Sequence, residues 1–130
     1  MHTFKELQKM VDRHIHSQQL VEEPVELYEP IEYALSTGGK RLRPVLVLMA
    51  ANLYSDNIQE AVMPALGIEV FHNFTLLHDD IMDQADIRRN QPTVHKKWNA
   101  NVAILSGDAM FIKAYEYLLH YQGYNIKQVL

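Results

Sequence analysis

The sequence predicts an all-α protein, a bundle of antiparallel helices. Three observations support this fold class: apolar residues recur at helical spacing along most of the chain, prolines and glycines stand where helices would begin or end, and the alternation typical of strands is nearly absent. Hydrophobic residues make up 48% of the 130 residues, which is enough for a packed core. We find no repeat, low-complexity tract or linker, so one domain or part of one is expected.

The first third of the chain is predicted to form two helices and a tight turn. Phe4–Ser17 carries one apolar stripe at helical spacing and therefore predicts an amphipathic helix. Pro24 and Pro30 each suit the first turn of a helix, where the missing N–H costs nothing. The segment Ile31–Thr37 is expected to end at Gly38-Gly39.

The middle of the chain is predicted to hold two further helices. Pro44–Tyr54 is expected to be the first; Val45–Leu48 alone could form a strand, but its setting is helical. Asp56 with Gln59 three residues later predicts a capping box for the second. That helix carries an acidic cluster and is expected to end near residues 83–85.

The last third of the chain is expected to continue in the same way. Its predicted elements are a polar loop over Gln84–Thr93 with its turn at Asn90-Gln91-Pro92, a short helix that Thr93 caps and that runs through Trp98, a long helix over Val102–Tyr121 that Gly123 stops, and the start of another over Tyr124–Leu130.

Charge and composition exclude several classes of protein. The formal net charge is −4, which argues against nucleic acid as the main partner, and the basic residues gather in small clusters that suit a small anion. Cysteine is absent, so disulfides and thiolate metal sites are excluded. The longest apolar run, Val45–Ala51, is too short to span a membrane, and the first residues lack a signal-peptide pattern. We therefore expect a cytoplasmic protein with no transmembrane segment.

The stretch Leu76–Asp83 places three carboxylates in an apolar, helical setting. With about 100° of rotation per residue, His72, Asp79 and Asp83 share one face of the helix. Asp80 lies about 80° from His72, at the edge of that face. Asp79 and Asp83 are like charges at i,i+4, and oxygen ligands of this kind suit Mg²⁺, which bridges carboxylates to phosphates. The alternative is a solvated acidic helix end that binds nothing.

Two basic clusters flank this helix in the sequence. Lys40 and Arg43 follow Gly38-Gly39 at a helix start, where free N–H groups favour anions and a guanidinium can bind phosphate through two nitrogens. Arg88 and Arg89 lie in the loop just beyond the aspartates and could fold back towards them. An ordinary solvated turn and a solvated loop are the alternatives for these two clusters.

The basic and acidic segments occur in a specific order along the chain: Gly38-Gly39-Lys40-Arg41-Leu42-Arg43-Pro44, then His72, then Asp79-Asp80-Ile81-Met82-Asp83, then Arg88-Arg89. This ordered set, which extends over residues 31–121, resembles the trans-isoprenyl diphosphate synthases, the polyprenyl synthetase family. The resemblance implies an all-α bundle of the isoprenoid synthase type, incomplete here, with residues 1–130 as the N-terminal part of a single domain. A homodimer is also implied.

The resemblance implies a reaction and residue roles as well. The diphosphate of isopentenyl diphosphate would be bound by Lys40, Arg43, His72 and Arg89. The allylic prenyl diphosphate would be bound through Mg²⁺ on Asp79 and Asp83, with Asp80 in support and with Arg88. The allylic C–O bond would ionise, the double bond of isopentenyl diphosphate would attack the cation, and loss of a proton would complete a prenyl transfer.

Product length is implied by the residues before the first aspartate. In such enzymes, bulk at the positions of Phe74 and Thr75 limits the product, so the aromatic Phe74 favours a short chain of farnesyl or geranylgeranyl size. Helix geometry complicates this inference, because Phe74 points about 140° from Asp79 and Thr75 only about 40°. If the pocket follows the aspartate face, Thr75 forms its floor and longer products become accessible.

The chain departs from the family pattern in one respect. A second aspartate-rich motif, expected on a later helix, is absent, since Glu116 is the only acidic residue after Asp108. We therefore expect this polypeptide alone to lack prenyltransferase activity. One alternative is a non-catalytic partner subunit, or a truncated relic, that only binds prenyl diphosphate or a partner chain. Another is a metal-dependent phosphohydrolase, which needs more histidine ligands than His72 and His78 supply.

Overall fold

The structure, a computed structural model, describes residues 1–120. The all-α prediction is confirmed, with one small two-stranded sheet as the exception. The elements are α1 (Phe4–Ser17), α2 (Val25–Ser36), α3 (Leu42–Asn52), α4 (Gln59–Met82), β1 (Ile87–Arg88), β2 (Gln91–Pro92), α5 (Val94–Lys97) and α6 (Ala100–Leu119).

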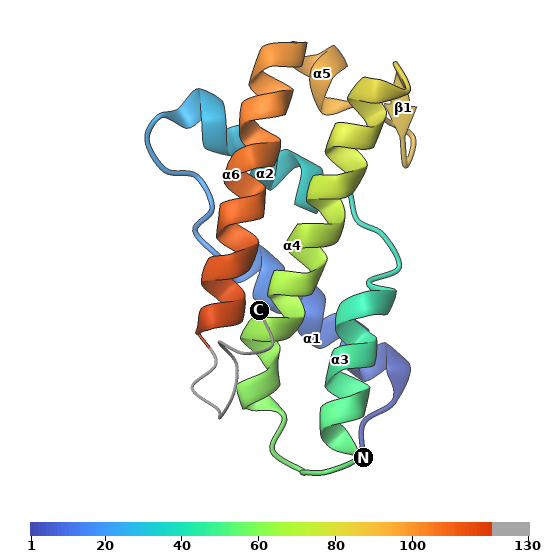
Figure 1. The fold of residues 1–130 in the computed structure, drawn as a ribbon. Helices are drawn as coiled ribbons and strands as arrows, with labels where there is room; N and C mark the ends of the chain where they lie inside the picture. Colours follow the sequence, from blue (N-terminus) through green and yellow to red (C-terminus); the bar gives the residue numbers. More distant parts are fainter. Residues whose placement is uncertain (121–130) are drawn as a thin grey trace.

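Helices α4 and α6 form the centre of the molecule. They run side by side in opposite directions, with α3 against α4 and with α1 and α2 behind them (Figure 1). Gly67 of α4 allows this close approach, because a Cβ there would lie 2.9 Å from the backbone oxygen of Ala114 in α6. The antiparallel arrangement expected of a bundle is therefore present in its main helix pair.

The core lies where α1, α2 and α3 meet this pair. From α1 it receives Leu7, Val11 and Ile15, which are at most 5% exposed, whereas Phe4 on the same predicted stripe is 38% exposed. Larger buried side chains of the other helices complete the core: Ile31, Leu35, Val45, Leu48, Leu66, Val70 and Met110. Burial of this apolar area supplies the main driving force for folding.

The beginnings of the first three helices match the sequence signals in part. Thr3 forms a capping box with Glu6 at the start of α1. Pro24 stands just before α2, but the prediction that Pro30 begins a helix is wrong, because α2 already begins at Val25 and Pro30 lies inside it. A single proline removes only one backbone hydrogen bond, and burial of Pro30 in the core offsets that loss.

Helix α3 begins two residues before Pro44, which takes a place in its first turn. Val45–Leu48 is helical, as its setting suggested. The predicted Asp56 capping box of α4 is wrong: Asn57 Oδ1 instead accepts a hydrogen bond from Gln59 N at 3.2 Å. The side chains of Asp56 and Asn57 have similar lengths, so the sequence alone did not show which of them would accept this hydrogen bond.

The segment after α4 folds into a hairpin that the sequence did not predict. Ile87 pairs with Pro92 and Arg88 with Gln91. The turn lies at Arg89-Asn90, both with positive φ, so the predicted turn at Asn90-Gln91-Pro92 is wrong by one residue. Paired left-handed residues match the twist of a hairpin, which explains the shift.

The last helices are close to their predicted positions. Thr93 precedes α5, but its hydroxyl donates to the oxygen of Ala85 rather than capping the helix. Helix α6 begins at Ala100, two residues earlier than predicted, because Asn99 caps it through Val102 N. The predictions for Tyr121, Gly123 and Tyr124–Leu130 fall outside the described residues. Within residues 1–120, no helix combines the length and hydrophobicity that crossing a bilayer requires.

Candidate functional site

Asp79 and Asp83 lie at the C-terminal end of α4, one turn apart and both exposed. Asp83 caps the helix, and its N–H donates to the oxygen of Asp79 at 2.8 Å. Within residues 1–120 neither carboxylate is held in an ion pair, and no set of three potential metal ligands is preassembled. Two exposed oxygen donors on one face fit a hard cation whose remaining positions are filled by water or phosphate.

Asp80 has a different environment from its two neighbours. Its carboxylate is 6% exposed and accepts two hydrogen bonds from Arg88, at 2.8 Å from Nε and 2.7 Å from Nη2. This hydrogen bonding, together with the charges of the three aspartates, raises the pKa of the Arg88 guanidinium. Asp80 therefore holds the hairpin against α4 and points away from the face shared by Asp79 and Asp83.

The first basic cluster meets α4 at His72. Arg43, exposed in the first turn of α3, lies with Nη1 3.2 Å from His72 Nε2. Burial lowers the pKa of His72, and the positive charge of Arg43 lowers it further. The neutral imidazole therefore accepts the hydrogen bond. Lys40, three residues before Arg43, is also exposed. Its backbone oxygen accepts a hydrogen bond from Gln8 Nε2 at 2.9 Å.

Arg89 is directed to the glycine turn, away from Arg88. Its Nη1 donates to the oxygen of Gly38 and lies 3.3 Å from Asn73 Oδ1. A Cβ on Gly39 would lie 2.9 Å from the Arg89 guanidinium, so any side chain there would have to displace Arg89. Burial lowers the pKa of Arg89, with the nearby Arg41 charge adding to the effect. The structure thus joins two segments that are about fifty residues apart in sequence.

The structure also shows site neighbours that sequence reasoning missed. Arg41 lies between Lys40 and Arg43 in the sequence, but unlike them it is 2% exposed, and it is bonded to Asp12 and Glu69. Asn73 and Glu69 lie on α4 about one and two turns before Leu76, and both are buried. Their i,i+4 spacing within an apolar part of the helix could have predicted a buried polar contact, since buried polar groups need partners.

Phe74 and Thr75 have distinct surroundings. Phe74 lies between α4 and α6, with its ring centroid 5.4 Å from Phe71, 5.3 Å from Phe111 and 4.9 Å from His78. Thr75 is half-buried, and its hydroxyl donates to the oxygen of His72 at 2.6 Å. The aromatic side chain therefore belongs to the α4/α6 contact, and it lies about 140° around the helix from Asp79.

His78 packs tightly against α6. Its Nε2 lies 3.2 Å from the oxygen of Ile104, and a Cβ on Gly107 would overlap its ring. These contacts give His78 a structural role between α4 and α6. His72 and His78 thus face different helices, which leaves no histidine cluster for a phosphohydrolase within the described residues.

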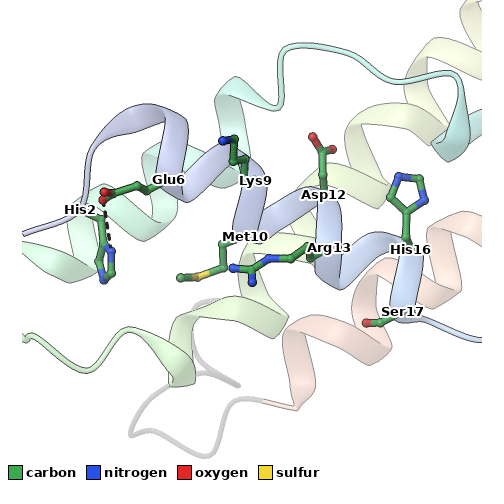
Figure 2. Close-up of a pocket in the computed structure, with 8 residues that line it drawn as sticks. All are labelled: His2, Glu6, Lys9, Met10, Asp12, Arg13, His16 and Ser17. Carbon is green, nitrogen blue, oxygen red and sulfur yellow. Dashed lines mark ion pairs between the residues drawn. The ribbon is translucent and has the colours of Figure 1, made fainter.

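A large open hollow lies elsewhere, along α1. It has a volume of about 890 Å³, and Figure 2 shows side chains of both charges around it. Its lining residues are His2, Glu6, Lys9, Met10, Asp12, Arg13, His16 and Ser17. None of the predicted site residues lines this hollow, so it does not coincide with the site at the end of α4.

Comparison with known proteins places this site in a family. The model of the polyprenyl synthetase family matches residues 24–130, a range that includes every predicted site residue. The chain belongs to the polyprenyl synthetase family.

Several individual proteins of this family are similar to the chain. A geranylgeranyl diphosphate synthase of Methanosarcina mazei is 48% identical over 98 residues, which are 75% of this chain and 30% of that protein. The crystal structure of a geranylgeranyl pyrophosphate synthase is 49% identical with a TM-score of 0.93 and covers 99% of this chain. A polyprenyl synthase of Caulobacter crescentus, solved with calcium and isoprenyl diphosphate, is 27% identical with a TM-score of 0.83, covering 95% of this chain and 38% of that one. The chain spans about a third of the length of these relatives.

Proposed function

We propose that residues 1–130 are the N-terminal part of a trans-prenyltransferase domain that condenses isopentenyl diphosphate with an allylic prenyl diphosphate. One observation carries this proposal: Arg43 contacts His72, which shares a face of α4 with Asp79 and Asp83, about two and three turns further along the helix. That face therefore offers an anion-binding group beside a pair of carboxylates suited to a cation. The names of the similar synthases support the same reaction.

We propose Mg²⁺ as the cation that Asp79 and Asp83 would hold. The two carboxylates supply hard oxygen ligands without a competing ion pair in the described part of the chain, and a divalent ion would relieve their mutual repulsion. The family member crystallised with calcium and isoprenyl diphosphate is consistent with a divalent cation at such a site. When bound, the ion would supply positive charge to the leaving diphosphate.

The side chains of this chain would perform the remaining tasks. Lys40, Arg43, His72 and Arg89 would bind the diphosphate of isopentenyl diphosphate, and Arg88, whose guanidinium is held by Asp80, would contact the allylic diphosphate. The allylic C–O bond breaks and its electron pair leaves with the diphosphate. The double bond of isopentenyl diphosphate then forms the new C–C bond, and a proton is lost. Apolar faces of α4 and α6 would exclude water from the cation.

We propose a product of geranylgeranyl size, the upper end of the farnesyl-to-geranylgeranyl range predicted from the sequence, or a longer product if the tail passes Thr75. Phe74 is engaged between α4 and α6, whereas the smaller Thr75 lies closer to the aspartate face. Thr75 would therefore line the path of the tail. A cytoplasmic homodimer is proposed on the family resemblance alone.

Calorimetric titration with isopentenyl diphosphate tests the site assignment. Lys40→Ala and Arg43→Ala should each weaken binding by about tenfold, because each removes a charged hydrogen bond to phosphate. Lys9→Ala and Arg13→Ala remove exposed cations of the same types on α1 and serve as matched controls. Equal affinity in all five proteins would refute the assignment. We expect binding without turnover from the 130-residue chain, so product formation by it would contradict that part of the proposal.

A further inference from the structure

A series of polar contacts in the interior begins at Arg41. Its guanidinium donates to Asp12 and Glu69, both at 2.9 Å, and to the oxygen of Leu35 at 2.7 Å. These three partners belong to α1, α4 and α2, so one side chain joins three helices. Arg41 also has φ 54 at the position just before α3. A non-glycine residue in this left-handed region is costly unless its surroundings fix it, and the three contacts do so.

The same series of contacts continues from Glu69 to Arg89. Asn73, 3% exposed, donates to the oxygen of Glu69 at 2.8 Å and to its Oε1 at 3.0 Å. Its own Oδ1 then accepts from Arg89 Nη1 at 3.3 Å. Arg89 in turn bonds to Gly38. We call Arg41, Glu69, Asn73 and Arg89 the polar network. It contacts the turn that carries Lys40 at both ends, through Arg89 at Gly38 and through Arg41 itself.

Burial makes this polar network a rigid unit. Glu69 and Arg41 form an ion pair in which both side chains are almost fully buried, so removal of either one would leave the other as an unpaired charge in the core. The amide of Asn73 can take only one orientation here, because its donor and acceptor ends meet chemically different partners. The buried residues Arg41, Glu69 and Asn73 therefore determine the position of the Arg89 guanidinium.

We propose that Asn73, held by Glu69 and Arg41, is a positioning residue that fixes Arg89 and the Gly38–Arg41 turn in the geometry that binds diphosphate. This inference rests on the proposed function of that site. Asn73 touches no substrate; it acts through Arg89. Without the Oδ1 of Asn73, Arg89 keeps its contacts to the glycine turn but loses the one that ties it to α4, so more rotamers become accessible and binding must then restrict them.

The test uses inorganic diphosphate and calorimetry on the complete chain. Asn73→Ala should weaken diphosphate binding by about tenfold, as loss of a hydrogen bond to a charged group does. Asn52→Ala is the matched control, because Asn52 is also a buried asparagine with two backbone partners but contacts no part of the polar network. It should lower the melting temperature without changing diphosphate affinity.

A double-mutant cycle distinguishes positioning from a general loss of structure. In an Arg89→Ala background, Asn73→Ala should have no further effect on affinity, because the residue through which it acts is gone. An equal effect in both backgrounds, or none in either, overturns the inference. If Lys40→Ala and Arg43→Ala also leave affinity unchanged, the proposed function fails; if they weaken it and Asn73→Ala does not, only the positioning role fails.

A measurement on the unmodified protein avoids any dependence on folding of the variants. The Nε–Hε order parameter of Arg89, measured by NMR without ligand, should be near the rigid value of about 0.85, while that of the exposed Arg13 should be below about 0.6. Similar low values for both arginines would overturn the inference.

Discussion

The three aspartates of α4 should separate cleanly into one that stabilises the fold and two that bind metal. Asp80→Asn removes the charge from a buried carboxylate that accepts two hydrogen bonds from Arg88 at 2.7 and 2.8 Å. A hydrogen bond to a charged group contributes about 1.5–3 kcal/mol when buried. Arg88 is 37% exposed, so solvent screening reduces this figure, and we expect a loss of about 1–2 kcal/mol.

Asp79→Asn and Asp83→Asn should have the opposite effect on stability. Each relieves repulsion between exposed like charges at i,i+4, a gain of about 0.2–0.5 kcal/mol. The same two substitutions should weaken Mg²⁺ binding in the presence of inorganic diphosphate by about tenfold or more, since even outer partners of metal ligands have effects of that size. Asp80→Asn should change Mg²⁺ affinity much less.

Urea unfolding and calorimetric Mg²⁺ titration measure the two properties separately. The free energy of unfolding should rank the variants with Asp80→Asn lowest, and the Mg²⁺ affinity should rank it highest of the three. Equal loss of stability in all three variants would refute the structural role of Asp80. A loss of Mg²⁺ affinity in Asp80→Asn as large as that in Asp79→Asn would refute the division of roles.

Three further predictions concern the glycine turn, His72 and the helix pair. Gly39→Ala should weaken diphosphate binding because its Cβ would displace Arg89, whereas Gly38→Ala, which also has positive φ but an open Cβ position, should only lower the melting temperature; equal affinities would contradict this. NMR titration should give His72 a pKa below its ordinary 6.5, so its contribution to stability is complete above that pH and is lost as the pH falls through the folded pKa. Added inorganic diphosphate should raise that pKa, and an unchanged value would argue against an anion beside the imidazole. Gly67→Ala should destabilise the fold by about 1–2 kcal/mol in urea, because overpacking against the Ala114 oxygen exceeds the gain in helix propensity; a more stable variant would show that α4 and α6 can separate without cost.

Local signals predicted the helices well where one residue type controls the start of an element. Thr3 with Glu6 caps α1, and Pro24 and Pro44 stand at or near the starts of α2 and α3. Prediction failed where neighbouring residues compete for one task. Asn57, and not Asp56, accepts a hydrogen bond from Gln59 N at the start of α4, and the hairpin turn lies at Arg89-Asn90 instead of one residue later. Both outcomes depend on backbone angles that tertiary packing selects.

Helical periodicity and residue spacing are local properties, so the helical fold class and the order of the candidate site residues could be predicted from the amino-acid sequence. It placed His72, Asp79 and Asp83 on one face, since a helix has a fixed rotation per residue. Tertiary structure alone decided which charged residue meets which partner. Arg41 is buried with Glu69, Arg88 is bound to Asp80, and Arg89 meets the glycine turn. These pairings join segments that are distant in sequence, and only the packing of α1, α2 and α3 against α4 brings them together.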